Sequence, residues 1–254
     1  MPTPFMHLAS AQEILADDLP ARVSCLLNEQ RGAFLLGNTG PDVQTVSGQA
    51  REETHFYAIP RTSRRPAYQT LVAAHPQLVR VDELPASQVA FVAGYVAHLT
   101  LDEIWLEDVF LRYFSGDEGS WRERAFAHNV LRTWMDAQAR RKVDDTVIVA
   151  LKNAALDGWL PFVADEHLRQ WRDWLIEQLA PGHHVQTAEV FARRMGVSAG
   201  EIEAMLRSPE QMEAQVFRRI PRAALRAFHD EGLKRSVAVI KRYVCGDINS
   251  VVTQ

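Results

Sequence analysis

The chain has 254 residues, of which 47% are hydrophobic and 24% charged, and its formal net charge is −4. This composition is that of an ordinary globular protein, and the length allows one large domain or two small ones with a sizeable core. The acidic balance and the scattered short basic runs give no specific signal for nucleic-acid binding.

The ends of the chain and its cysteines give expectations about location. The first 20 residues lack the basic start and long apolar run of a signal peptide. The longest apolar stretch, 89–97, is far shorter than the roughly 20 residues that cross a bilayer, so we expect a cytoplasmic protein without a transmembrane segment. Cys25 and Cys245 lie in apolar, helix-like contexts and are expected to be core thiols rather than a disulfide or metal ligands.

The hydrophobic pattern predicts an all-α fold, because nearly every periodic segment has helical spacing and no run alternates as a strand does. Helices are expected at about 4–17, 20–30, 66–74, 85–114, 120–139, 143–156, 160–179, 187–195, 198–206, 209–219 and 221–245. Ser198 and Glu201 have the spacing of a capping box. We expect a single helical domain over 1–254, with C-terminal helices at about 143–247.

A long segment between the second and third expected helices stands apart. Residues 37–42 are dense in turn residues, and 43–65 show little periodicity, which predicts a long irregular crossing. Long loops are uncommon in compact domains and are often functional. This one contains Asp42 and His55.

His98 and Asp102 lie four residues apart in the most apolar part of the chain, 89–105. Their side chains therefore leave one face of a helix together. The usual meaning of such a pair is a surface ion pair, but Phe91 and Gly94 on the same face indicate burial. A buried carboxylate is costly unless it is neutralised, and one neutral imidazole is not enough. Gly94 leaves room for another group to approach, so a bound metal is the favoured interpretation.

The order of these residues resembles that of the zinc-dependent phospholipase C family, whose all-helical fold is shared with the P1-type nucleases. The resemblance covers roughly residues 5–110. It is carried by His7, Leu36-Gly37 followed by Pro41-Asp42, His55-Phe56, and Gly94-Tyr95 followed by His98-x-x-x-Asp102.

The resemblance implies a multi-helix bundle with a long metal-binding loop and a metal-site portion at about 5–136. By analogy Asp42, His55, His98 and Asp102 would bind one ion, while His7 and a bridging Asp102 would bind a second. Mixed nitrogen and oxygen ligands suit zinc, and also manganese, iron or cobalt. The implied activity is hydrolysis of a phosphoric ester by a metal-bound hydroxide, with Asp42 doubling as base. The implied substrate is a small phosphodiester or a phospholipid head group.

The sequence also departs from the family. Secreted members use the amine of an N-terminal tryptophan as a ligand, and this chain has no tryptophan near its start. A third metal would need ligands after the central helix, where the candidates are Asp108 and His128, with Arg132 in place of a glutamate. With these ligands a third ion is doubtful. A place for His128 behind the ligands or facing the substrate fits about as well as a capped or solvent-facing position on a helix.

Two other interpretations stay open. The missing ligands favour a non-catalytic helical binding or assembly protein with a structural metal, in which the tryptophans of 159–174 form a partner surface or simply part of the core. His229-Asp230 has the form of the dyad in HD-type phosphohydrolases, which are also helical. Its place near the end of the chain, without the other ligands of that family, argues against it.

Overall fold

The computed structural model describes residues 1–116, 119–180, 182 and 186–248, and over these residues it contains helices and no strand. The prediction of an all-α fold is confirmed. The helices are α1 (Pro4–Leu15), α2 (Ala21–Glu29), α3 (Arg31–Gly37), η1 (Gly40–Val43), α4 (Gln44–Ser47), α5 (Arg51–His55), α6 (Ala67–Ala74), η2 (Pro76–Val79), η3 (Val81–Glu83), α7 (Ala86–Ile104), η4 (Trp105–Leu111), α8 (Trp121–Lys142), α9 (Asp145–Lys152), α10 (Asp165–Leu179), α11 (Thr187–Met195), α12 (Ala199–Arg207), α13 (Pro209–Met212), η5 (Glu213–Phe217) and α14 (Arg222–Val244).

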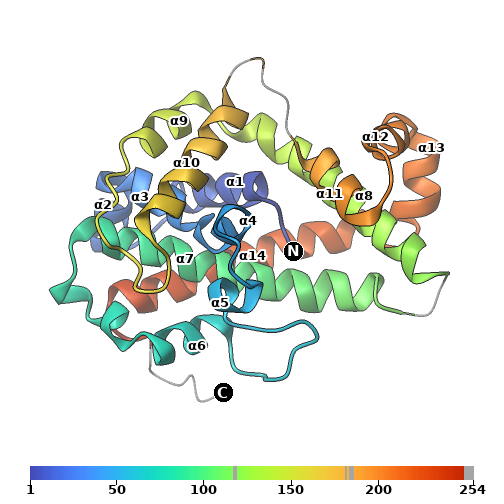
Figure 1. The fold of residues 1–254 in the computed structure, drawn as a ribbon. Helices are drawn as coiled ribbons and strands as arrows, with labels where there is room; N and C mark the ends of the chain where they lie inside the picture. Colours follow the sequence, from blue (N-terminus) through green and yellow to red (C-terminus); the bar gives the residue numbers. More distant parts are fainter. Residues whose placement is uncertain (117–118, 181, 183–185, 249–254) are drawn as a thin grey trace.

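Helix α7 forms the centre of the molecule and continues into the π-helical segment η4 (Figure 1). Every residue from Val89 to Ile104 is buried, because α3 and α14 pack extensively against α7. By length and composition the continuous helix Ala86–Leu111 could cross a membrane, but its most apolar window is completely buried inside the protein. That burial fits a core helix.

The other helices surround this centre. Helix α1 packs along α8, and α9 lies against α3 and α10. Helices α11 and α12, together with η5, pack on α8 at one end of the molecule (Figure 1). The buried apolar side chains form one continuous cluster that reaches from Phe5 to Ile248.

The segment 43–65 is only in part the irregular crossing that the sequence predicts, because residues 48–50 and 56–65 are irregular and the rest is helical. It contains the short helices α4 and α5, and η1 precedes them directly. These helices show no helical periodicity in the sequence because each has at most five residues. Gly48 ends α4 in the left-handed conformation, with φ +73°. Helix α3 was also missed, since its run Ala33–Gly37 is buried on all sides and has no polar face.

The cysteine prediction is half right. Cys25 and Cys245 are both free, but they are exposed rather than part of the core. On α2 the buried positions are Val23 and Leu27, so Cys25 falls on the outer face, where its thiol donates to Glu29. Cys245 follows the last residue of α14.

Capping boxes begin the helices α8 and α12. Ser198 accepts a hydrogen bond from the backbone N–H of Glu201, whose carboxylate accepts from Ser198 N, as the sequence predicts. Ser120 and Glu123 make the same exchange at the start of α8. The start of the long helix α8 is therefore fixed locally.

Asp136 joins three parts of the fold. Its carboxylate is fully buried on α8 and accepts hydrogen bonds from the hydroxyls of Thr3 and Thr187. Thr3 precedes α1, and Thr187 is the first residue of α11. The segment before α1 and the start of α11 are thus both held to α8.

The buried carboxyl group of Asp136 predicts that the stability of the protein depends on pH. Burial raises the pKa of Asp136 to about 6, although the two hydroxyls favour the ionised form. In the unfolded chain an aspartate titrates near about 3.9. The protonated carboxyl therefore adds about 3 kcal/mol to the free energy of unfolding below about pH 4. This contribution is lost as the pH rises through about 6.

Asp136→Asn should remove this term, so the variant should become more stable relative to the wild type as pH rises from 4 to 7. Urea denaturation of both proteins across this range measures the difference in the free energy of unfolding. A constant difference between the two curves would show that Asp136 titrates normally in the folded protein.

Candidate metal centre

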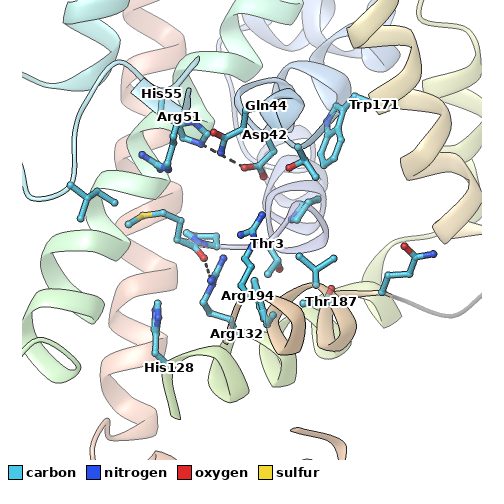
Figure 2. A pocket seen from close by; sticks show the side chains of 18 of the residues that line it. Thr3, Asp42, Gln44, Arg51, His55, His128, Arg132, Trp171, Thr187 and Arg194 are labelled. Carbon is cyan, nitrogen blue, oxygen red and sulfur yellow. Dashed lines mark hydrogen bonds and ion pairs between the residues drawn. The ribbon is translucent and has the colours of Figure 1, made fainter. Parts of the chain in front are cut away.

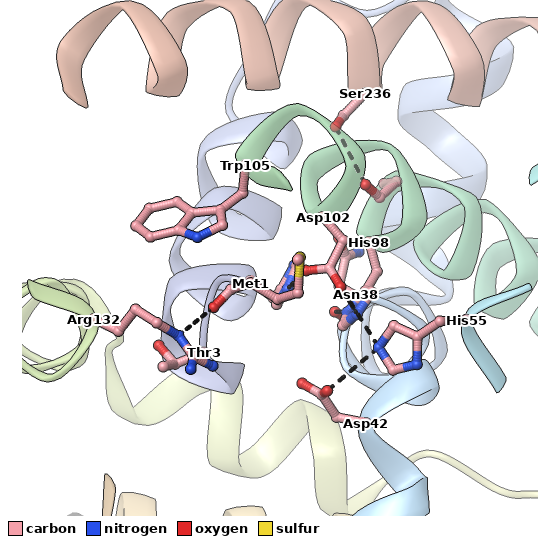
Figure 3. A network of polar contacts seen from close by, with 12 residues as sticks. Met1, Thr3, Asn38, Asp42, His55, His98, Asp102, Trp105, Arg132 and Ser236 are labelled. Carbon is pink, nitrogen blue, oxygen red and sulfur yellow. Dashed lines mark hydrogen bonds and ion pairs between the residues drawn. The ribbon is translucent and has the colours of Figure 1, made fainter. Parts of the chain in front are cut away.

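Five side chains predicted from the sequence to bind metal meet beside the middle of α7 (Figure 3). They come from separate parts of the chain: α1, η1, α5 and, for the last two, α7. All except Asp42 are buried. The five residues are His7, Asp42, His55, His98 and Asp102.

Asp102 lies between the imidazoles. Its Oδ1 is 3.4 Å from His7 Nε2, and its Oδ2 is 3.6 Å from His55 Nε2 and 3.8 Å from His98 Nε2. The rings of His7 and His98 stack at 3.7 Å between centroids, and His55 Nε2 is 3.6 Å from Asp42 Oδ1. The two oxygens of Asp102 thus face different histidines, which is the arrangement that a bridging carboxylate needs.

Two overlapping groups of ligand atoms could each hold one ion. The first consists of His7, Asp42 and His98, and the second of His55, His98 and Asp102. Within each group the ligand atoms lie within 4.8 Å of one another. Because both groups need the single free lone pair of His98, they are alternative sets of three ligands rather than two sites that can be filled together.

Several of these atoms have no hydrogen-bond partner. Among the described residues, both ring nitrogens of His7, Nε2 of His98 and Oδ1 of Asp102 are buried and unpaired. Leaving a buried polar group without a partner costs about 1–3 kcal/mol. One nitrogen of His7, Nε2 of His98 and Oδ1 of Asp102 can each offer a lone pair here, and such lone pairs gathered in one place fit a bound cation.

Neighbouring groups orient two of the rings. Asn38, which follows α3, accepts a hydrogen bond from His98 Nδ1 at 2.8 Å, which leaves the Nε2 lone pair facing Asp102. Thr54 Oγ1 lies 3.0 Å from His55 Nδ1. Such contacts to the far nitrogen fix the tautomer and orientation of metal-binding histidines.

The protonation states also suit metal binding at neutral pH. Burial lowers the pKa of His98 to about 3, and the nearby ring of His7 adds to the effect. Burial alone would raise the pKa of Asp42, but its hydrogen bond with His55 and the proximity of His98 lower it to about 2. Such a carboxyl is a weak proton acceptor, which suits a ligand better than a general base.

Sequence reasoning missed Arg51 and Tyr57, which complete the cluster. Arg51 Nη2 donates to Asp102 Oδ2 at 2.7 Å and to the Tyr57 hydroxyl at 2.8 Å, and that hydroxyl donates to the same Asp102 oxygen at 3.3 Å. Arg51 thereby neutralises part of the charge of Asp102. The available signal was the spacing, since Arg51 precedes His55 by one turn of α5.

The structure places the candidates for a third site elsewhere. Asp108 is exposed and lies outside both ligand groups, on the π-helical segment η4 that follows α7. His128 is buried between the rings of Phe110 and Phe114, and its Nε2 accepts from Trp105 Nε1 at 3.0 Å. It lines the neighbouring cavity without belonging to either group.

The remaining candidates have ordinary roles. His229 is partly exposed and contacts Glu13 at 2.8 Å on the surface, and Asp230 beside it is 80% exposed. The HD-type interpretation therefore finds no buried site at this dyad. Trp159 and Trp171 are buried in the core rather than displayed as a partner surface.

A cavity of about 290 Å³ opens onto the metal-ligand cluster (Figure 2). Asp42, Arg51 and His55 form its wall on the side of the cluster. Side chains from the start of the chain and from α8, α10 and α11 form most of the rest. A small molecule in this cavity would contact the candidate metal ligands directly.

Comparison with known proteins gives no relative: no family model, no curated protein and no solved structure matches this chain. The geometry of the cluster is therefore the finding on which a functional assignment rests. The structure shows two buried His/Asp groups, each able to hold a metal ion, beside a cavity of small-molecule size.

Proposed function

We propose that this protein is a metal-dependent hydrolase of phosphoric esters. The observation that carries the proposal is the pair of overlapping ligand groups that share His98 and border one cavity. Asp102 presents one oxygen to His7 and the other to His55 and His98, which favours a dinuclear site, as in many enzymes that cleave phosphate esters. The order of the ligands along the chain, which resembles that of the zinc-dependent phospholipases C, supports the same activity.

Zinc is the proposed metal, because three imidazoles and two carboxylates form a mixed nitrogen and oxygen set; manganese, iron or cobalt would also suit these ligands. His98 has one free lone pair and would serve one ion only, so His55, His98 and Asp102 would hold one ion, and His7 and Asp42, with Asp102 shared, would hold the other. Bound divalent ions would lower the pKa of a water molecule and neutralise charge on the phosphoryl group.

The chain's own residues would position the substrate. The side chain of Asp42 is 21% exposed, so it is the carboxylate of the set that reaches the cavity. Arg51 lines the cavity while contacting Asp102, so its guanidinium can hydrogen-bond a phosphoryl oxygen. Asn38 and Thr54 keep the histidine rings in place during turnover.

Elemental analysis together with hydrolysis of bis-p-nitrophenyl phosphate tests the proposal. We expect one to two zinc ions per chain and turnover that a chelator abolishes. His98→Ala removes the residue common to both ligand groups, so it should lose metal and reduce turnover by roughly 10³-fold. His229→Ala, on the surface beside Glu13, is the matched control and should keep both properties.

The outcomes separate the two interpretations. Metal without turnover of any phosphoric ester would contradict the enzyme and favour a binding protein with a structural metal. Purified protein without metal, which also fails to bind added zinc, would contradict both.

A further inference from the structure

The charges around the cavity are unbalanced. Three arginines, Arg51, Arg132 and Arg194, line it against one carboxylate, Asp42. Arg51 is paired with Asp102, which lies behind the cavity wall. The two other guanidinium groups thus remain on the opposite side of the cavity from Asp42 and His55 (Figure 2).

Arg132 has only neutral partners. Its Nε donates to the backbone carbonyl of Met1 at 2.5 Å, and its Nη1 donates to Asn129 Oδ1 at 3.0 Å. Its guanidinium lies 4.1 Å from the centre of the Phe191 ring. The nearest carboxylate on α8, that of Asp136, accepts instead from the hydroxyls of Thr3 and Thr187.

Arg194, on α11, adds a second positive charge. Burial lowers the pKa of Arg132 to about 10, and the charge of Arg194 is the second cause of this lowering. The two guanidinium groups are therefore close enough to interact electrostatically. Among the described residues, neither forms an ion pair with a carboxylate. Two guanidinium groups this close to each other repel unless an anion lies between them.

We propose that Arg132 and Arg194 form an anion subsite, so that the substrate is a phosphoric ester carrying a second negatively charged group. This inference rests on the proposed hydrolase function. The ester phosphate would lie at the metal-ligand cluster, and a second phosphate or carboxylate would lie between the two arginines. A head group with a quaternary ammonium would meet two guanidinium groups here and is therefore disfavoured.

The aromatic wall indicates what joins the two anionic groups. Trp171 and Trp174 line the cavity from α10 with their rings stacked at 5.0 Å, and Phe191 lies beneath Arg132. These surfaces suit a planar or apolar linking group. A nucleotide with a second phosphate and a phosphorylated inositol lipid share this chemistry.

Arg194→Gln is the test variant, and Arg193→Gln is its matched control. Arg194 is exposed, so its replacement should leave folding intact; Arg193 is the adjacent exposed arginine and does not line the cavity. Calorimetric titration with inorganic phosphate should give the same Kd for the wild type and Arg193→Gln. Arg194→Gln should bind phosphate about tenfold more weakly, since a charge-assisted hydrogen bond is lost.

Two matched substrate pairs identify the source of the second anion. One is the p-nitrophenyl ester of thymidine 5′-phosphate with and without a phosphate on the 3′ hydroxyl. The other is vesicles of phosphatidylinositol with and without a phosphate on the inositol ring. In one pair, kcat/KM should be at least about tenfold higher for the member with the additional phosphate, and this ratio should fall towards one in Arg194→Gln.

Failure of the two proposals can be distinguished. Equal kcat/KM for both members of each hydrolysed pair, or equal phosphate affinity in Arg194→Gln and Arg193→Gln, would overturn the anion subsite while leaving the hydrolase intact. Absence of hydrolysis of every ester would overturn the hydrolase. The phosphate titration would then still measure the subsite.

Discussion

Replacing Asp102 by asparagine should abolish metal binding at one or both positions and reduce phosphodiester hydrolysis by roughly 10³-fold or more. The carboxylate faces His7 with one oxygen and His55 and His98 with the other. Asparagine keeps the size but replaces one oxygen by an NH₂ group, which cannot coordinate a cation. It also leaves Arg51 without its buried counter-charge, which makes a second positive charge at this place still less favourable.

Metal content per chain and kcat/KM are measured together for this variant. Asp108→Asn is the matched control, because Asp108 lies further along the same continuous helix and is exposed outside both ligand groups. We expect its metal content and activity to equal those of the wild type. An Asp102→Asn protein that keeps two ions and near-normal turnover would refute the bridging role.

His7→Ala distinguishes the two ligand groups. His7 belongs to the group with Asp42 and His98, so its loss should leave His55, His98 and Asp102 able to retain one ion. The sequence identifies residues that can bind metal. Which of them bind the same ion depends on how α1 packs against η1 and α7 in three dimensions.

The sequence predicted the helical class and most helices because the longer ones carry a clear apolar face and strong end signals. Ser198 and Glu201 are an example, since both hydrogen bonds of their capping box depend on neighbours within one turn. The helices it missed are short or wholly buried. Helix α3 has only seven residues, and tertiary packing rather than its own pattern makes it helical.

The five ligand candidates could be predicted because each lies in a short sequence motif that resembles a motif of a known family. Arg51 and Arg132 could not, because an arginine on a helix is usually solvated, and only the approach of distant segments shows what it faces. Asp108 was proposed from spacing alone, and the helical geometry turns it away from Asp102. Gly94 was understood correctly as leaving room, but the group that approaches is the protein's own backbone.

That close approach predicts that Gly94→Ala destabilises the protein strongly for the addition of a single methyl group. A Cβ at this position would overlap the carbonyl oxygen of Phe34 and lie 2.7 Å from the backbone N of Asn38. Neither can give way as a flexible side chain would, because both belong to the end of α3. Overpacking of a core usually costs about 1–3 kcal/mol, and we expect the upper end or beyond, with Tm lower by roughly 6–10 °C.

The same substitution should also disturb the metal centre. Asn38 O accepts the hydrogen bond that orients His98. Moving α3 away from α7 would lengthen this bond and turn His98 Nε2 away from the other metal ligands. We therefore expect weaker zinc binding in whatever fraction of Gly94→Ala folds, measured by competition with a chromogenic chelator.

Gly200→Ala is the control: it makes the same change in helix α12, where the new Cβ meets only Ser198 Oγ at 3.8 Å. It should raise stability by about 0.5–1 kcal/mol, as alanine does in an exposed helix, and leave zinc affinity unchanged. Equal Tm and zinc affinity in the two variants would mean that α3 and α7 pack less closely than the structure shows.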